Sequence, residues 1–258
     1  MKPSASLFTA RAYGIVGLLI ALLLWAFISY SSNGFLAQQL RPLASFQQLF
    51  YLLQSADFYW HIALSLKRIA IGLGGAFLLG LPLGLFLGGS LIFRQTFTPI
   101  CQFLRMISPL SWMPIAVMAF GIGDKAIYFL LIMAAVWPIA LNTAHGAQQL
   151  NPQWRLLSQS LSATRTEFVL HILLPAIRKD VVTGLRLALG VVWIVLVPCE
   201  MLGVNAGLGY FILDTRDRMA YSELMATLMV IGVIGYALDS FCQSLGAIRL
   251  KLPKTQFA

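Results

Sequence analysis

Long apolar runs separated by short polar stretches dominate the chain. Six of these runs approach the ~20 residues that a helix needs to cross the hydrocarbon core of a bilayer. They occupy roughly residues 12–31, 61–92, 98–120, 126–145, 181–203 and 223–246. The pattern predicts an all-α fold, a polytopic membrane helix bundle with six transmembrane helices.

The first run is interpreted as a retained helix rather than a cleaved secretory signal. It is too long for the apolar region of a signal, and residues 28–32 make a poor cleavage site. The mildly apolar stretch 32–58 is expected to lie along the outer face of the membrane. The predicted organisation is an N-terminal transmembrane helix with a periplasmic interfacial segment (1–60), a core (61–246) and a basic cytoplasmic tail (247–258).

The composition agrees with a lipid environment. Only 10% of the residues are charged, against about 25% in a typical soluble domain, and the mean hydropathy is +0.81. The net charge of +9 is assigned to loops that set topology and meet anionic lipid, not to nucleic-acid binding. Cys101, Cys199 and Cys242 lie in apolar stretches without metal-ligand spacing, so no metal site is expected.

The distribution of basic residues orients the predicted helices. If both termini are cytoplasmic, the inner segments carry ten Lys and Arg residues and the outer segments carry four, Arg41, Lys125, Arg216 and Arg218. Because positive charge accumulates on the cytoplasmic side, this orientation is preferred. It places the polar stretch 151–176 in the cytoplasm, where 151–168 is predicted to form an amphipathic helix that docks a soluble partner.

Small residues recur every four positions in the second apolar run, at Gly72, Ala76, Gly80, Gly84 and Gly88. This spacing puts them on one helix face, where a neighbouring backbone can approach closely. Close packing is the preferred interpretation, and a face that slides when the bundle changes state is the alternative.

Ionisable residues occur inside the predicted helices, where charge is costly and usually paired or functional. Arg68 and Glu200 lie at similar depth near the outer side, so an ion pair between them is expected. Arg186 and Asp239 lie at similar depth near the inner side. The alternative is that surplus cations line a path for an anion, with Arg68 and Arg105 as candidates.

Two prolines bracket polar and aromatic residues in the third run, at Pro109 and Pro114. The spacing favours a broken helix, which membranes tolerate where the segment lines a cavity; a kinked helix is the alternative. The candidate residues of a translocation path are Arg68, Arg105, Ser108, Ser111, Trp112, Met113 and Glu200.

The chain lacks the patterns of phosphate loops, hydrolase nucleophile elbows, His-Glu-x-x-His zinc motifs and paired catalytic carboxylates. It is not expected to be catalytic itself. Energy for transport would have to come from a partner or from an ion gradient.

Several motifs together resemble the permease subunits of bacterial ABC importers. The stretch Leu157-Ser158-Gln159-Ser160-Leu161-Ser162-Ala163-Thr164-Arg165, followed by Leu173-Leu174-Pro175-Ala176, is similar to their cytoplasmic coupling loop. The motifs Ser65-Leu66-x-Arg68, Arg105-x-x-Ser108-Pro109, Gly184-Leu185-Arg186 and Glu200 resemble the nitrate, sulfonate, taurine and bicarbonate group. Ser162 stands where this group usually has Gly, and a left-handed backbone there would carry a cost that Gly avoids.

The resemblance implies a type I importer permease in the bacterial inner membrane. Its partners would be a second copy of this chain, two ATPase subunits that bind ATP and Mg²⁺, and a periplasmic or lipid-anchored solute-binding protein. Residues 157–165 would couple ATPase closure to a switch between inward-open and outward-open paths for a small anion. No cofactor is expected on this chain. An ion-gradient-driven transporter or channel is the alternative.

Overall fold

The computed structural model describes residues 7–31, 34 and 38–247. All elements in this part of the chain are helical, and no strand occurs in it, which confirms the predicted all-α fold. Two compact units are distinguished, Met1–His61 with Phe211–Ile231, and Ile62–Tyr210 with Gly232–Ala258. From residue 248 on, the predicted basic tail lies outside the described residues.

The first unit begins with α1 (Leu7–Ser31) and α3 (Pro42–Leu52). Trp25 links α1 to the turn before α3, because its indole Nε1 donates a hydrogen bond to the carbonyl oxygen of Leu40 at 3.0 Å. Pro42 occupies the first turn of α3, where a missing N–H costs nothing. The same unit contains the turn between α12 (Leu208–Asp217) and α13 (Tyr221–Ala247), where Arg218 bridges Asp214 and Glu223 at 2.9 Å each.

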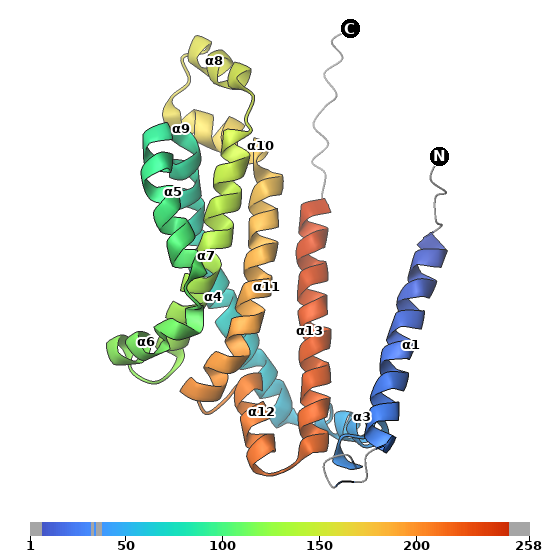
Figure 1. Ribbon diagram of the computed structural model, residues 1–258. Helices are drawn as coiled ribbons and strands as arrows, with labels where there is room; N and C mark the ends of the chain where they lie inside the picture. The colour runs from blue at the N-terminus through green and yellow to red at the C-terminus, as the bar shows by residue number, and fades with distance from the viewer. Residues whose placement is uncertain (1–6, 32–33, 35–37, 248–258) are drawn as a thin grey trace. The chain divides into compact units, whose positions relative to one another are not determined.

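The second unit contains most of the remaining helices (Figure 1). In chain order they are α4 (Ala56–Gly89, in this unit from Ile62 on), α5 (Leu91–Met106), η1 (Pro109–Trp112), α6 (Met113–Phe120), α7 (Asp124–Gln148), α8 (Pro152–Ser160), α9 (Arg165–Glu167), η2 (Phe168–Leu173), α10 (Leu174–Ala176) and α11 (Arg178–Gly203). Helices α7 and α11 lie side by side along much of their length.

The core of the second unit is built around α7, the most enclosed of the long apolar helices. Its buried face carries Leu130, Leu131, Ala135 and Ile139, which pack with residues of α4 and α11. The small-residue stripe of α4 faces α7. A methyl group on Gly84 would lie 2.5 Å from the carbonyl oxygen of Ala140, and Ala76 is fully buried. Close packing of the stripe is therefore confirmed.

Four of the six predicted spans coincide with helices long and apolar enough to cross a membrane, namely α4, α7, α11 and α13. The described apolar part of α1, Val16–Ser31, falls in a shorter class. The count of six spans therefore stays a prediction, as do the segment boundaries at 60 and 246.

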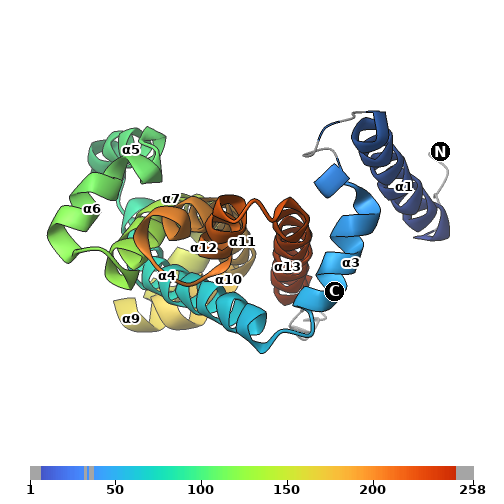
Figure 2. The same ribbon diagram turned by 90° about the horizontal axis from the view of Figure 1, so that it is seen from below.

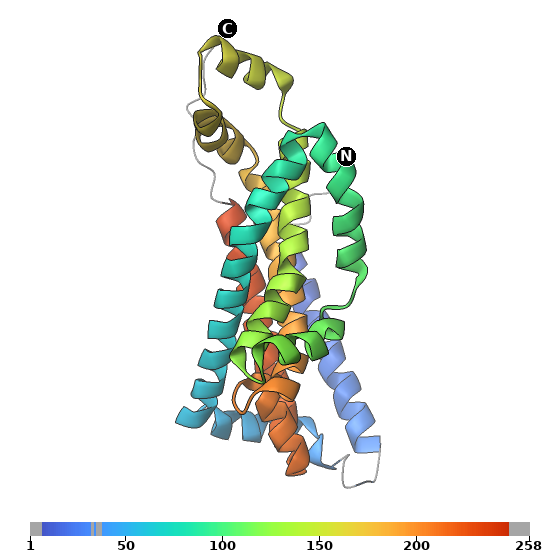
Figure 3. The same ribbon diagram turned by 90° about the vertical axis from the view of Figure 1, so that its left-hand side faces the viewer.

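The third predicted span, 98–120, consists of two helical pieces that meet at an 88° bend. Helix α5 runs beside α7, and α6 departs from the direction of α5 while still contacting α7 (Figures 2 and 3). Ile107 and Ser108 are extended at the break, with ψ of 124° and 129°. Pro109 disfavours the helical conformation in the residue before it and explains the break. The predicted broken helix is confirmed, and the alternative of a kinked helix is wrong.

Replacing Gly84 by Ala is expected to lower the melting temperature of the detergent-purified protein. The new methyl group would meet the Ala140 carbonyl oxygen at 2.5 Å and the Thr143 Cβ at 2.6 Å. Overpacking of this kind costs on the order of 1–3 kcal/mol. The matched control is Gly74→Ala in the same helix, where a methyl group would meet nothing within 4 Å. Equal melting temperatures for the two variants would contradict the close packing.

Candidate functional site

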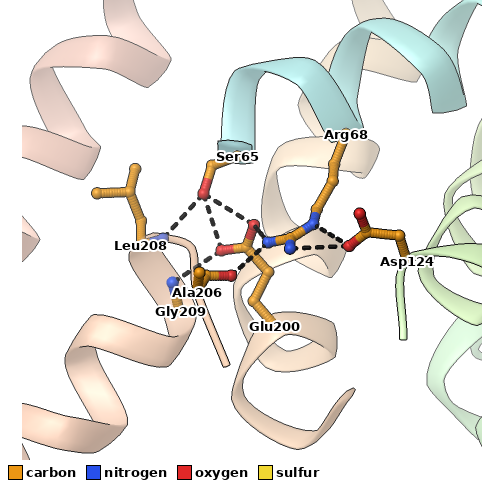
Figure 4. Close-up of polar contacts among 7 residues, drawn as sticks. All are labelled: Ser65, Arg68, Asp124, Glu200, Ala206, Leu208 and Gly209. Carbon is orange, nitrogen blue, oxygen red and sulfur yellow. Dashed lines mark hydrogen bonds and ion pairs between the residues drawn. The ribbon is translucent and has the colours of Figure 1, made fainter. Parts of the chain in front are cut away.

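A buried ion-pair network lies where α4, α7 and α11 meet the start of α12 (Figure 4). Arg68 Nη1 is 2.6 Å from Glu200 Oε1, and Arg68 Nη2 is 2.8 Å from Asp124 Oδ1. Arg68 is 3% exposed and Glu200 is fully buried. The expected Arg68–Glu200 pair is confirmed.

The network satisfies the remaining polar atoms of this pair. The Glu200 carboxylate accepts hydrogen bonds from the Ser65 hydroxyl at 2.8 Å and from the Gly209 N–H at 2.8 Å. Arg68 also donates to the carbonyl oxygen of Ala206 at 2.6 Å. A buried ion pair is tolerated only when such bonds compensate for the lost hydration. The arrangement therefore fixes four chain segments relative to one another within the unit.

Gly207 makes this geometry possible. Its φ of +127° lies in the region that favours glycine. A side chain there would also place a Cβ 2.5 Å from Arg68 Nη1 and from the Glu200 carboxyl carbon. The loop can approach the ion pair only because this residue has no side chain.

Sequence reasoning missed two members of the network. The sequence offered no partner for Asp124, and Ser65 appeared only as part of a motif with Arg68. Ser65 is three residues before Arg68, so helical spacing puts both on one face and offered a signal. The contact with Asp124 depends on how α7 begins, and no local pattern specifies that.

A second ion pair joins α11 to the C-terminal half of α13. Arg186 Nε is 2.6 Å from Asp239 Oδ1, and Arg186 Nη2 is 2.9 Å from Asp239 Oδ2, which is a two-point contact. The expected pair is confirmed. Both side chains are nearly half exposed, at 45% and 42%, so the pair contributes little stability by itself.

A pocket of about 150 Å³ lies beside the break between α5 and η1. Arg105 and Trp112 line it from the broken segment, and Trp137, Pro138 and Val191 line it from α7 and α11. The structure thus brings together two of the predicted path residues. Among the others, Ser108 and Ser111 are exposed, Met113 packs against the core, and Arg68 and Glu200 belong to the buried network. The path role of all seven stays a prediction.

The predicted docking segment is not one continuous helix over 151–168. Helix α8 ends at Ser160, and Ser162 has a φ of +53°. The N–H of Ala163 donates to Ser158 O at 2.9 Å, and that of Ser162 donates to Gln159 O at 3.0 Å. These are the two bonds of a Schellman motif, which requires a left-handed residue after the helix. The expectation of a position that suits Gly at 162 is therefore confirmed.

A capping box restarts the helix after this turn. The Thr164 hydroxyl accepts from the Glu167 N–H, and the Glu167 carboxylate accepts from the Thr164 N–H at 2.8 Å. The bond from the Thr164 N–H, followed by that from its hydroxyl, lowers the pKa of Glu167 below its ordinary value. The motif 157–165 therefore forms the end of α8, a tight turn and the start of α9.

The apolar side chains of this segment are turned outward. The exposed fractions are 52% for Trp154, 62% for Leu156, 51% for Leu157 and 72% for Leu161. Ser158 points inward, is buried, and donates to the carbonyl oxygen of Arg155 at 2.8 Å. On the inner side, a groove of about 730 Å³ separates the segment from the last turns of α4.

These features define a polytopic α-helical membrane protein with an amphipathic segment between two of its long helices. Residues 80–245 match the family described as "Binding-protein-dependent transport system inner membrane component". The chain belongs to this family.

Relatives of this chain include permeases of several import systems. It is 36% identical over 182 residues to the nitrate import permease protein NrtB of Leptolyngbya laminosa, covering 70% of this chain and 65% of that one. It is 34% identical to the bicarbonate transport system permease protein CmpB of Synechococcus elongatus over 71% of this chain and 66% of the relative. It is 32% identical to the taurine transport system permease protein TauC of Escherichia coli over 71% of this chain and 67% of the relative. The alignment spans about 65% of the length of the nitrate permease.

Two solved structures share the fold. A bacterial ABC transporter involved in the import of alginate has a TM-score of 0.65 at 17% identity, covering 94% of this chain and 98% of that chain. The inward-facing MetNI methionine ABC transporter has a TM-score of 0.62 at 18% identity, covering 75% of this chain and 98% of that chain.

Replacing Arg68 by Gln is expected to destabilise the protein by about 3–5 kcal/mol, because it leaves the fully buried Glu200 without its counter-charge. The matched control is Asp124→Asn, which removes the other carboxylate. Its side chain is 39% exposed, so the expected loss is only about 0–1 kcal/mol. Thermal unfolding of both variants in detergent measures the difference. Similar stabilities of the two variants would show that burial of the Arg68–Glu200 pair does not determine the loss of unfolding free energy.

Proposed function

We propose that this chain is the permease subunit of an ATP-driven, binding-protein-dependent importer of a small anion. The observation that carries the proposal is the outward-facing apolar surface of α8 and its turn, which bears the coupling motif and has no covering partner among the described residues. Such a surface between two long apolar helices suits docking to a soluble subunit. The relatives named for nitrate, bicarbonate and taurine support an anionic substrate.

In this proposal the chain is not catalytic. Two ATPase subunits bind ATP and Mg²⁺, and each receives the α8 segment of one permease copy in a homodimer. Leu157 and Leu161 contribute apolar contact, and the Schellman turn at Ser162 fixes the angle at which α9 follows. A tight turn transmits movement better than a flexible loop would, because its backbone hydrogen bonds resist bending. A periplasmic or lipid-anchored binding protein delivers the anion from the other side.

The translocation path is proposed to run between the two copies, beside the break at residues 107–108. Arg105 and Trp112 line the pocket there, and the exposed Ser108 and Ser111 offer hydroxyls near it. Met113 would help to form a movable constriction. Arg68 and Glu200 are saturated by protein partners, so their proposed contribution is to hold the helices around the path.

The proposed location is the bacterial inner membrane, with both termini in the cytoplasm. The support for this orientation is the excess of Lys and Arg in the segments assigned to the inner side. The same orientation puts α8 on the side where ATP is available.

Replacing Leu161 and Ala163 together by Asp is expected to abolish stimulation of the partner ATPase and its copurification. Leu161 is 72% exposed, and two carboxylates would have to be desolvated at the proposed contact. The matched control is Gln153→Asp, which adds a charge at the exposed start of α8, where the helix dipole favours it. ATPase activity of the purified complex, with and without binding protein, is the measurement. Normal coupling in the double variant would refute the docking role, and an unmodified chain that copurifies with no ATPase would favour a gradient-driven transporter or channel.

Cysteine substitution along 106–116, in a background lacking the native cysteines, tests the proposed path. A water-soluble thiol reagent is expected to modify positions on one side of the segment, such as Ser108 and Ser111, at rates that change with ATP. The fully buried Ala116 provides the matched negative position. If none of the tested positions reacts in any nucleotide state, the path does not pass along this segment.

A further inference from the structure

Helix α5 carries a polar stripe, and the function proposed above uses only one of its residues, Arg105. At about 100° per residue, Arg94, Gln95, Thr98, Gln102 and Arg105 fall within an arc of roughly 100° on this helix. The rest of the circumference is apolar except for Thr96. The Thr96 hydroxyl satisfies itself by donating to the carbonyl oxygen of Ile92 at 3.0 Å.

The side chains of the stripe have no polar partner among the residues that the structure describes. Gln95, Gln102 and Arg105 are exposed, and Arg94 and Thr98 are half-buried. No hydrogen bond or ion pair links any of the five side chains to another described residue. Uncompensated polar groups are expensive in hydrocarbon, so this face requires either water or a second protein surface.

The stripe extends along α5, beside a helix that is long and apolar enough to cross a membrane. Arg94 and Thr98 line a pocket with His145 and Gln148, at the C-terminal end of α7. Further along, Arg105 lines the pocket at the break with Met133 and Trp137. Helix α5 therefore runs antiparallel to α7 (Figure 3), which is itself long and apolar enough to cross a membrane. From Arg94 to Arg105 the rise is about 16 Å, roughly half of a bilayer core.

The charge of this surface is of one sign. Helix α5 contains two arginines and no Asp or Glu, and no carboxylate occurs among the described residues that line the two pockets. An unpaired guanidinium offers planar donors that match the oxygens of a small oxyanion. The amides of Gln95 and Gln102 and the hydroxyl of Thr98 supply uncharged donors between the two arginines. Binding at such a row of weak sites is compatible with passage.

We propose that this stripe lines the water-filled inner limb of the translocation path and binds a small oxyanion. Arg105 is the first ligand, at the pocket beside the break, and Arg94 is the last before release at the α8 side. The inference rests on the proposed anion import and adds to it the helix, the residues and the order in which they meet the anion. A second copy of α5 packed against the stripe is the rival occupant.

Cysteine labelling on opposite faces of α5 separates these possibilities. In a background without native cysteines, Gln95→Cys and Gln102→Cys place thiols on the stripe, and Ile100→Cys and Phe103→Cys place matched thiols on the apolar face. All four positions are exposed in the single chain. An anionic, membrane-impermeant thiol reagent is expected to modify the stripe positions at least about tenfold faster, since only water-filled surfaces admit it. Nitrate, bicarbonate and taurine are tested in turn as protecting anions, and at least one should slow the labelling.

A charge test complements the labelling. Gln102→Glu is expected to reduce uptake of the protecting anion by about tenfold relative to Gln102→Asn, because a carboxylate repels an anion at short range. Copurification of the ATPase with each variant shows that the variant is folded. Uptake that is equally low in Gln102→Asn would show that repulsion by the carboxylate is not the cause, and it would overturn the assignment.

Other outcomes also overturn the inference. If the stripe thiols resist the reagent and oxidise to disulfides between two copies, the stripe is an interface. If they react but no anion protects them and Gln102→Glu transports normally, the stripe is exposed to water but does not bind the anion. Labelling needs no ATPase, so a stripe that reacts and is anion-protected in a chain that binds no ATPase would preserve this inference and refute the proposed function.

Discussion

The absence of water from a bilayer core is the constraint on which the rest of this structure depends. Each polar group at membrane depth must find a partner inside the protein or face a water-filled space. The first solution is shown by Arg68, Glu200 and Asp124, which form ion pairs and hydrogen bonds with other groups of the same chain. Helix α5 shows the opposite case, since its exposed Gln95, Gln102 and Arg105 have no such partners in the described part of the chain. The same constraint thus separates residues that hold the bundle from residues proposed to serve the path.

The two kinds of surface are connected through α7. One side of this helix is locked against the small-residue stripe of α4, where Gly72, Gly80, Gly84 and Gly88 leave no room for a side chain. Another side carries the pocket at the break and the pocket near Arg94. In the proposed function, this packing would carry a movement of the α8 turn to the broken segment. A permease that alternates between two orientations of its helices needs both rigid helix packing and a polar face along the path.

Much of this organisation was predictable from sequence because its signals are local. The length of the apolar runs predicted α4, α7, α11 and α13, the four-residue spacing predicted the close-packed stripe, and Pro109 predicted the break. Matched depth was sufficient to predict the Arg68–Glu200 pair. Contacts fixed by tertiary geometry were beyond reach: Asp124 joins the network only through the position of α7, and Gly207 is needed only because its loop touches the pair. The docking segment was predicted as one helix because the Schellman turn has a Ser in the place where a Gly would have marked it.

The central claim is that ATP hydrolysed by a partner drives an anion through this chain. Its most direct test is uptake of nitrate, bicarbonate or taurine into sealed vesicles that contain the chain with its ATPase and receive the binding protein outside. The account predicts accumulation of one of these anions that requires ATP and the binding protein and that persists when proton and sodium gradients are collapsed. Accumulation that follows an imposed ion gradient without ATP would contradict it.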